Sequence, residues 1–269
     1  MNLIDIERSI IKKHRKGIWV KFLRAIKDYN LVEDGDTIGV CISGGKDSFL
    51  MAKCFQELKK HSKYKFNLKF IVMNPGYKKD NLNQIIKNAK DLNIQIEVFK
   101  SNIFEYLSTK NNNPCYMCAR MRRGNLYNKA KELECNKIAL GHHFDDVIET
   151  VLLNIFYNGV FGGMPPKLRS DNFEGMELIR PMYYIKEEDI RYWASTNELK
   201  FLNCACSVTS MKYSSKRKEI KELIKELKKE NENIDINIFR SLENVNINTL
   251  NGYIKDKNKK IFNDIYEDK

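Results

Sequence analysis

The chain has 269 residues, 42% of them hydrophobic, which is enough to bury a sizeable core in one large domain or two small ones. It has no run of about 18 apolar residues and no charged-then-apolar start, so we expect neither a membrane span nor secretion, and we expect the cytoplasm. The formal net charge of +12 favours a polyanionic partner such as nucleic acid, although a lysine-rich solvated surface would give the same charge.

Helix and strand patterns alternate along most of the chain. Residues 3–30 carry apolar side chains at three-to-four spacing among Lys and Arg, which predicts a basic amphipathic helix with a break at Gly17. The alternation that follows predicts a parallel sheet with right-handed crossovers. The predicted strands are 36–42, 67–73, 95–99 and 137–140, and the predicted helices are 49–60, 81–92, 121–133 and 145–156.

The last third of the chain is less regular. Residues 158–171 are rich in Gly and Pro and predict a loop. Beyond them we expect a strand at 177–181, helices at 187–197 and 215–232, and a tail with partial order. The predicted fold class is α/β with a doubly wound parallel sheet. Its predicted parts are a basic helical segment (1–30), a central domain (31–210) and a charged helical extension (211–269).

A glycine-containing loop follows the first predicted strand. Its residues are Ser43, Gly44, Gly45, Lys46, Asp47 and Ser48. The glycines let the backbone approach an anion, and N–H groups at the start of the next helix point towards one. The serines add hydroxyl donors, the lysine adds a positive charge, and the aspartate could hold magnesium. The spacing differs from the ordinary P-loop, so the stretch predicts another phosphate-binding loop, with a simple Gly-Gly turn as the alternative.

Two pairs of cysteines are the second candidate site. Cys115 and Cys118 stand one helical turn apart beside three arginines, a setting that favours thiolates. Cys204 and Cys206 supply further thiols. Three thiolates could hold an iron-sulfur cluster with one iron left open, and a zinc site or a redox pair is the alternative. In a reducing compartment the seven cysteines are thiols or metal ligands rather than disulfides.

A third group of polar residues follows the strand at 137–140, where open α/β sheets bind ligands. Its members are Gly141, His142, His143, Asp145, Asp146 and Glu149. The aspartates begin a predicted helix, so N-capping is the alternative interpretation. Capping does not explain the histidines and Glu149 together, and the group is therefore predicted to complete the phosphate site.

Together these motifs resemble the tRNA 2-thiocytidine synthetase (TtcA) family of PP-loop ATP pyrophosphatases. The resemblance rests on residues 43–48, 114–127, 140–150, 164–168 and 179–181, in that order, and spans about residues 20 to 206. The related 2-thiouridine enzymes (TtuA) are less similar, because their zinc-binding cysteine pairs are missing at both ends of this chain.

The resemblance implies an adenine nucleotide alpha-hydrolase-like fold and ATP-dependent thiolation of a tRNA pyrimidine, with cytidine as the expected base. It also implies a 4Fe-4S cluster held by three cysteines. Cys115 and Cys118 match the first two ligands, and alignment from residues 200–202 favours Cys204 over Cys206 as the third.

Further roles follow from the same resemblance. The catalytic candidates are Lys46, Asp47, Asp145 and Asp146, with Mg²⁺ near the aspartates. ATP is expected at residues 43–48, Gly141 and His142. The tRNA-binding candidates are Arg120, Arg122, Arg123, Lys167 and Arg169, with surface salt bridges as the alternative.

Several alternatives stay open. A PP-loop enzyme could act through a cysteine persulfide without iron or on another substrate, and a non-catalytic nucleotide- and zinc-binding RNA module would share these motifs. The sulfur donor is either sulfide or the product of a cysteine desulfurase. The tRNA, the base position and the oligomeric state are not decided by the sequence, and a homodimer is one option.

Overall fold

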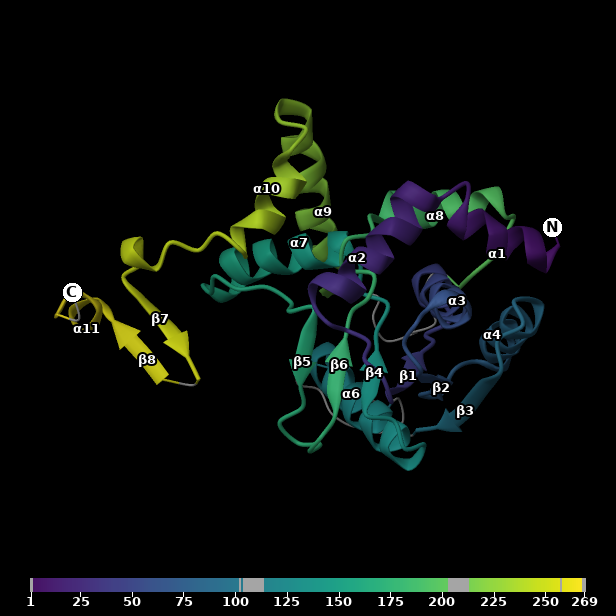
Figure 1. Cartoon of the computed structure of the whole chain (residues 1–269). Coiled ribbons are helices and arrows are strands. Elements are labelled where there is room, and N and C mark those ends of the chain that lie inside the picture. Colours follow the sequence, from purple (N-terminus) through teal and green to yellow (C-terminus); the bar gives the residue numbers. More distant parts are fainter. Residues whose placement is uncertain (1, 102, 104–113, 203–212, 257, 268–269) are drawn as a thin grey trace.

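A six-stranded sheet forms the centre of the molecule (Figure 1). The computed structural model describes every residue except 1, 102, 104–113, 203–212, 257 and 268–269. The strand order is β3-β2-β1-β4-β6-β5, and only β5 runs antiparallel to its neighbour. The strands are β1 (Thr37–Cys41), β2 (Asn67–Asn74), β3 (Ile96–Lys100), β4 (Lys137–Ala139), β5 (Lys167–Arg169) and β6 (Glu177–Ile179). The predicted α/β class is confirmed.

The direction of strand addition reverses between β1 and β4. From β1 the chain adds β2 and β3 on one side, and then returns to place β4 on the other side of β1. Such a switch point leaves a crevice at the carboxyl ends of the two strands, where α/β proteins bind ligands. The segments that follow β1 and β4 therefore meet at this edge of the sheet.

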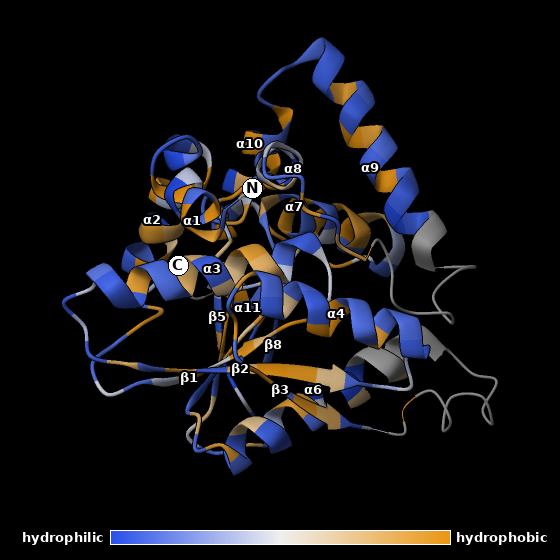
Figure 2. Ribbon diagram, turned by 90° about the vertical axis from the view of Figure 1, so that its right-hand side faces the viewer, coloured by the Kyte–Doolittle hydropathy of each residue, from blue (hydrophilic) through white to orange (hydrophobic). Residues whose placement is uncertain are grey.

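Helices cover both faces of the sheet. Figure 2 shows α6 on one face and α3 and α4 on the other. Because successive residues of a strand point to opposite faces, Val40 packs with the larger helical layer and Cys41 packs with α6. The helices of this part are α3 (Lys46–His61), α4 (Lys79–Asp91), α6 (Pro114–Glu132), α7 (Phe144–Leu153) and α8 (Glu187–Thr196). None of the helices that the structure describes has the length and apolar content needed to cross a bilayer.

The N-terminal segment is helical as predicted, but its break lies elsewhere. Helix α1 (Leu3–Ile11) is followed by a turn at 12–14, a short π-helix (Arg15–Trp19) and α2 (Val20–Asp28). Gly17 lies within the π-helix and allows close approach of α8, since a Cβ on Gly17 would stand 2.3 Å from Asp189 Oδ1. The predicted break at Gly17 is therefore wrong, and this glycine serves packing.

Two predicted loops contain regular structure. Helix α6 begins at Pro114, seven residues before its predicted start at 121, so the backbone of Cys115 and Cys118 is helical. Proline is favoured at the first helical position, where its missing N–H costs nothing. Strand β5 lies inside the predicted loop at 158–171 and pairs with β6 from Lys167↔Ile179 to Arg169↔Glu177.

The C-terminal tail is more ordered than predicted. After α9 (Tyr213–Glu230) come α10 (Ile234–Ser241), a 3-10 turn (Ile247–Thr249), the hairpin β7 (Gly252–Lys255) and β8 (Asn258–Ile261), and α11 (Phe262–Glu267). Phe239 of α10 stacks on Phe144 of α7 with ring centroids 4.9 Å apart. Ile220 and Ile224 of α9 belong to the same hydrophobic core as the sheet. The hairpin and α11 stand apart from the body (Figure 1).

Candidate active site

The loop between β1 and α3 has the geometry of an anion cradle. Gly44 has a φ of +93°, in the left-handed region that favours glycine. The hydroxyl of Ser48 accepts the N–H of Ser43 at 3.2 Å and donates to the carbonyl of Gly45 at 2.9 Å, which closes the loop. Gly45 occupies the N-cap position and has no side chain to cap the first turn of α3. The loop therefore presents backbone N–H groups at a helix start, as an anion site requires.

Gly141 brings the segment after β4 against this loop. A Cβ on Gly141 would lie 3.2 Å from the backbone nitrogen of Ser48 and 3.3 Å from the carbonyl carbon of Asp47. These are backbone atoms of the first turn of α3, which cannot move aside cheaply. A side chain at 141 would press on this backbone by a few tenths of an ångström, so glycine favours the close approach of the segment after β4 to the phosphate loop.

A cavity of about 410 Å³ opens at this junction. Of the predicted nucleotide-binding residues, it is lined by Ser43, Asp47, Ser48, Gly141 and His142. The other side chains with polar or aromatic groups in the lining are Tyr77, Arg122, Arg123 and Arg180. Its volume is in the range of small-molecule sites. The structure thus brings the loop, the segment after β4 and the arginines of α6 to one cavity.

Lys46 lies on the other side of the loop from this cavity. Its Nζ stands 3.1 Å from Asp47 Oδ1 and 3.1 Å from Glu187 Oε1. Although burial alone would lower the pKa of Lys46, the two carboxylates raise it above its ordinary value. Lys46 and Gly45 line a second cavity, of about 550 Å³, bounded by α8. Lys46 is therefore a protonated side chain beside the loop, and its position is set by ion pairs with Asp47 and Glu187.

Glu187 is a site residue that the sequence analysis missed. Besides Lys46, it receives hydrogen bonds from Arg191 at 2.9 Å and from Lys221. Burial would raise its pKa, but these hydrogen bonds lower the pKa to about 2. Its position in the acidic first turn of α8 was the available signal, and it indicated a helix start only.

His143 lies among three of the predicted catalytic carboxylates. Its Nε2 is 3.9 Å from Asp47 Oδ1 and 3.5 Å from Asp146 Oδ2, and its Nδ1 is 3.6 Å from Asp145 Oδ2. Burial lowers the pKa of His143, but the contact with the carboxylate of Asp145 and the charges of Asp146 and Asp47 raise the pKa overall. A protonated imidazole would balance these acids.

Asp145 and Asp146 also hold the local fold. Asp145 Oδ2 accepts the N–H of Glu187 at 2.7 Å, and Asp146 Oδ2 accepts the N–H of His143 at 3.1 Å as part of a capping box. The alternative interpretation, N-capping, therefore holds for Asp146. Neither aspartate lines the cavity, whereas Asp47 does.

Two buried side-chain atoms at this junction make no hydrogen bond to the described residues. Asp47 Oδ1 and His142 Nδ1 are buried without a hydrogen bond, and the contact of Asp47 Oδ1 with Lys46 is an ion pair only. Burial lowers the pKa of His142 to about 4, despite the nearby Asp146, so its ring is neutral at pH 7. His142, with a neutral ring, and the carboxylate of Asp47 both line the cavity, and these groups fit a bound nucleotide and its magnesium ion.

The thiol candidates can be located only through their neighbours. The side chains of Cys115 and Cys118 and all of Cys204 and Cys206 lie outside the described residues. Arg122, four residues after Cys118, lines the cavity, and Leu202, two residues before Cys204, donates its N–H to the carbonyl of Gly44 at 3.3 Å. Among the side chains that are described, no three metal-binding groups form a cluster.

The five tRNA-binding candidates fall into two places. Arg122 and Arg123 line the cavity, and Arg120 is exposed on the same helix. Lys167 and Arg169 lie on β5, where Lys167 Nζ is 3.0 Å from Glu177 Oε2 and Arg169 Nε is 3.8 Å from Glu177 Oε1. The structure brings the α6 arginines to the site and gives the β5 pair a salt-bridge partner, so tRNA contact by the β5 pair remains a prediction.

Two further arginines reach the site from distant parts of the chain. Arg180, which follows β6, is buried beside the cavity and donates to the carbonyl of Pro165; burial and the charge of Arg123 lower its pKa to about 10. Arg217 of α9 pairs with Asp146 at 3.1 Å and Glu149 at 3.4 Å. No residue spacing links α9 to α7, so the contacts of Arg217 could not be predicted from the sequence.

The fold and the cavity define a nucleotide-binding α/β protein with a PP-loop. Consistent with this class, the chain matches the PP-loop domain family over residues 18–227. It is 39% identical to the tRNA-cytidine(32) 2-sulfurtransferase of Ralstonia pickettii, over 82% of this chain and 70% of that protein. It is 35% identical to the tRNA-cytidine(32) 2-sulfurtransferase of Geobacter metallireducens, over 91% of this chain and 93% of that protein. The chain therefore belongs to the tRNA-cytidine(32) 2-sulfurtransferase family of PP-loop proteins, and the predicted family is confirmed.

A solved structure shares the fold. The U34-tRNA thiolase NcsA from Methanococcus maripaludis, determined with its [4Fe-4S] cluster, superposes with a TM-score of 0.70. The two chains are 24% identical, and the match covers 88% of this chain and 78% of NcsA. This likeness supports the doubly wound PP-loop architecture.

Substitution of Gly141 tests whether ATP binding needs the close approach of this residue to the backbone of Asp47 and Ser48. In Gly141→Ala the new methyl group presses on the backbone of Asp47 and Ser48, so we expect ATP affinity to fall about tenfold or more, which corresponds to at least about 1.4 kcal/mol. Calorimetric titration with ATP measures it. Gly124→Ala is the matched control, because nothing lies within 4 Å of a Cβ there. Equal ATP affinity in the two variants would contradict the role of Gly141.

The buried Glu149 predicts a pH-dependent stability. Burial raises its pKa from 4.5 to about 7, and Arg217 offsets this only in part. Between these pH values the unfolded state has lost the proton that the native state keeps, so stability falls as pH rises through this window. We expect the urea midpoint of Glu149→Gln to rise relative to that of the natural protein as the pH is raised from 5 to 7.5. A constant difference between the two urea midpoints across this range would contradict the raised pKa of Glu149.

Proposed function

We propose that this protein is a tRNA sulfurtransferase that uses ATP to replace the C2 oxygen of a cytidine by sulfur. One observation carries the proposal. A phosphate loop and the helix that begins at a cysteine pair line the same cavity, so activation of an oxygen and delivery of sulfur can occur at one place. By analogy with its relatives, the target is cytidine 32 of tRNA. A tRNA substrate would place the enzyme in the cytoplasm.

The first step activates the oxygen. The C2 oxygen of the base attacks the α-phosphorus of ATP, the bond from that phosphorus to the bridging oxygen breaks, and pyrophosphate leaves. The backbone N–H groups and hydroxyls of the Ser43–Ser48 loop would hold the pyrophosphate. Arg180 and the two arginines of α6 place positive charge on the cavity wall opposite the loop. The protein contributes position and charge to this step.

Magnesium would bind at Asp47 and the phosphates. Asp47 is the predicted catalytic carboxylate that lines the cavity, and its Oδ1 is ion-paired with Lys46 at 3.1 Å. An ion with few protein ligands and several phosphate and water ligands is usual for Mg²⁺. Asp145 and Asp146 would act through His143, which they hold beside Asp47.

The second step exchanges the activated oxygen for sulfur. Sulfur attacks C2, the bond from C2 to the adenylated oxygen breaks, and AMP leaves with that oxygen. Cys115, Cys118 and either Cys204 or Cys206 would hold a 4Fe-4S cluster, whose open iron would supply the sulfur. Leu202, two residues before Cys204 in the sequence, donates its N–H to the loop carbonyl of Gly44. The helix start at Pro114 favours thiolates at 115 and 118.

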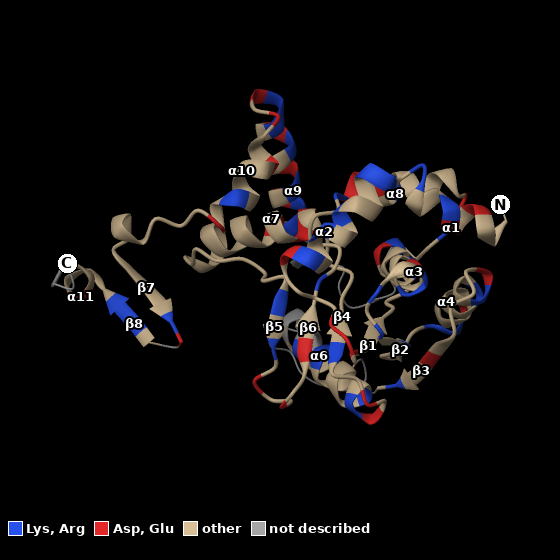
Figure 3. Ribbon diagram, in the orientation of Figure 1, with Lys and Arg blue, Asp and Glu red and all other residues tan. Residues whose placement is uncertain are grey.

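The anticodon loop would approach over α6. Arg120, Arg122 and Arg123 follow the cysteine pair along this helix, and lysines and arginines also lie along α9 (Figure 3). Phosphate contacts would position the tRNA and the cavity would select the base. The sulfur itself would come from sulfide, or from the persulfide product of a cysteine desulfurase with a thiol as the two-electron reductant that cleaves the S–S bond.

A single assay tests the proposal. Protein purified without oxygen should convert ATP to AMP in the presence of tRNA and form 2-thiocytidine, measured by nucleoside analysis. We expect Cys115→Ser to abolish thiolation and visible absorption while ATP binding stays intact, because the thiol lies outside the phosphate loop. Cys135→Ser, which changes a buried cysteine away from the cavity, is the control and should keep all three.

Three results would contradict it. Thiolation by Cys115→Ser would show that the cysteine pair is not needed for sulfur transfer. Formation of 2-thiocytidine by a colourless protein would indicate that a cysteine persulfide, and not an iron-sulfur cluster, carries the sulfur. A different thiolated nucleoside would overturn the choice of cytidine.

A further inference from the structure

An exposed apolar patch lies on the segment that connects α7 to β5. The seven residues that follow Asn154 are all exposed, and five of them are large and apolar. These five are Ile155, Phe156, Tyr157, Val160 and Phe161, and we call them the 155–161 patch. The turn of π-helix that opens the segment (Asn154–Asn158) buries none of its side chains. Contiguous exposed apolar side chains of this kind mark an interaction site.

Hydrogen bonds hold the backbone of this segment in place. The carbonyl of Asn154 accepts the N–H of Val160 at 3.0 Å, and its side-chain amide donates to the carbonyl of Gly162 at 2.8 Å. Further along, the carbonyl of Met164 accepts the hydroxyl of Tyr183 at 2.8 Å. The backbone is therefore fixed at both ends, while the apolar side chains between them stay at the surface.

The 155–161 patch is close to the cavity beside the phosphate loop. Met164 lines that cavity. Phe161 precedes Met164 by three residues, and three residues of chain span at most about 11 Å. An RNA loop with one base in the cavity would therefore bring its neighbouring bases to the patch.

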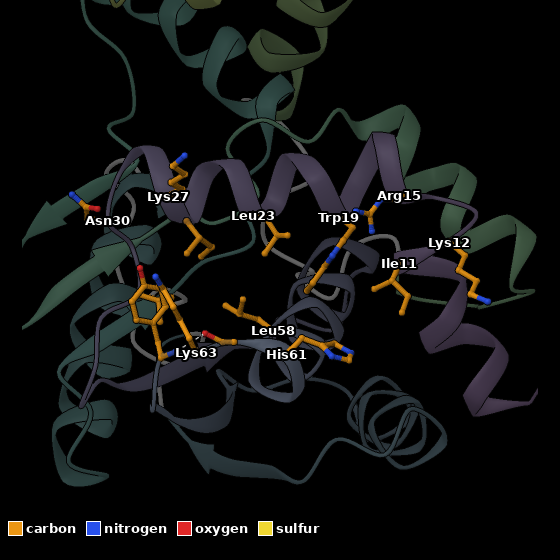
Figure 4. Close-up of a pocket in the computed structure, with 14 residues that line it drawn as sticks. Ile11, Lys12, Arg15, Trp19, Leu23, Lys27, Asn30, Leu58, His61 and Lys63 are labelled. Carbon is orange, nitrogen blue, oxygen red and sulfur yellow. Dashed lines mark hydrogen bonds between the residues drawn. The ribbon is translucent and has the colours of Figure 1, made fainter.

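A larger pocket elsewhere in the chain does not share this position. It has a volume of about 820 Å³, and Leu23 of α2 and Leu58 of α3 line it (Figure 4). Helix α3 has 16 residues, so its last turn is about 24 Å from the phosphate loop at its start. The 155–161 patch is the apolar surface beside the reacting base, and that pocket is not.

Helix α9 adds positive charge to the patch. Lys216 Nζ stands 4.4 Å from the centre of the Tyr157 ring, which is a cation–π contact. The hydroxyl of Tyr157 donates to Glu219 Oε2 at 2.7 Å, so the ring is held from the same helix. Lys216 and Lys218 are both exposed. Aromatic rings beside exposed cations are typical of surfaces that bind single-stranded nucleic acid.

Chemistry at C2 of a base in an RNA loop creates a need for such a surface. A base that stacks on its neighbours reaches a cavity only when it is turned out of the stack. Its neighbours then lose a stacking partner, and proteins that bind RNA loops replace that partner with aromatic side chains. Phe156 and Phe161 are the most exposed rings of the patch, at 58% and 48%.

We propose that the 155–161 patch is a stacking platform for the bases that flank the target base in the tRNA loop, with Phe156 and Phe161 as the stacking rings. This inference rests on the proposed function, because it takes the substrate to be a tRNA loop. Lys216 and Lys218 would neutralise phosphates next to the stacked bases.

Binding of an RNA hairpin to the full chain tests the proposal. The hairpin has the anticodon stem and loop of the substrate tRNA, and fluorescence anisotropy measures its affinity without ATP. We expect Phe156→Ala and Phe161→Ala each to weaken binding about tenfold, as loss of one base–aromatic stack does. The salt dependence of binding should not change, because no phosphate contact is removed. Urea midpoints equal to that of the natural protein check that the variants fold.

Two further variants separate stacking from other effects. Phe156→Tyr should keep the natural affinity, whereas Phe156→Leu should not, because leucine is apolar but not planar. Tyr192→Ala removes a ring of α8 that is 53% exposed, and this matched control should bind RNA like the natural protein.

Abasic nucleotides in the RNA locate the contact. A hairpin that lacks the bases on either side of the target should bind the natural protein and Phe156→Ala equally, because the stacking partner is then missing from both complexes. A tenfold difference that persists with this hairpin would contradict stacking on the flanking bases.

Three other results would overturn the proposal. These are natural RNA affinity in both alanine variants, equal RNA affinity of the leucine and tyrosine variants, and alanine variants that change the mass of the protein in light scattering but not its RNA affinity. The last would assign the patch to a protein partner. If the natural protein bound no tRNA, the proposed function would fail as well, whereas tRNA binding that is unchanged in the variants would overturn this inference alone.

Discussion

The close contact between Gly141 and the first turn of α3 is the constraint on which the site depends. Strands β1 and β4 are neighbours at the point where strand addition reverses, and both end at the same edge of the sheet. With a side chain at 141, the segment after β4 would be held away from the backbone of Asp47 and Ser48. His142, His143 and the start of α7 would move with it. The glycine therefore favours a short distance between the phosphate loop and the segment that carries His142 and His143.

Around this contact, charge is arranged in two zones. The cavity wall carries Arg122, Arg123 and Arg180, which suits a triphosphate. Behind the loop, Lys46, Glu187 and Lys221 form a linked group, and His143 joins three carboxylates. These buried acids would repel a nucleotide if they were unpaired. Because these acids pair with Lys46, His143 and Arg217, their negative charge is offset, and the arginines of the cavity wall determine the charge that the substrate meets.

Local patterns were enough to predict every strand of the sheet except β5, and to single out the loop at 43–48 and the polar group after β4. In each case apolar runs, glycines and polar residues lie within a few positions of one another. The boundary of α6 was missed, because the cysteine and arginine pattern has no helical periodicity of apolar residues before Met121. Glu187 and Arg217 were missed for a different reason. Their partners are 141 and 71 residues away, and only the tertiary fold brings them together.

The central claim is that ATP activates the oxygen that sulfur then replaces, within one cavity. Transfer of an isotope tests it most directly. If tRNA that carries ¹⁸O at C2 of the target cytidine is thiolated, the oxygen should appear in AMP, one atom for each 2-thiocytidine formed. Release of the label to water or to pyrophosphate, with unlabelled AMP, would contradict the account.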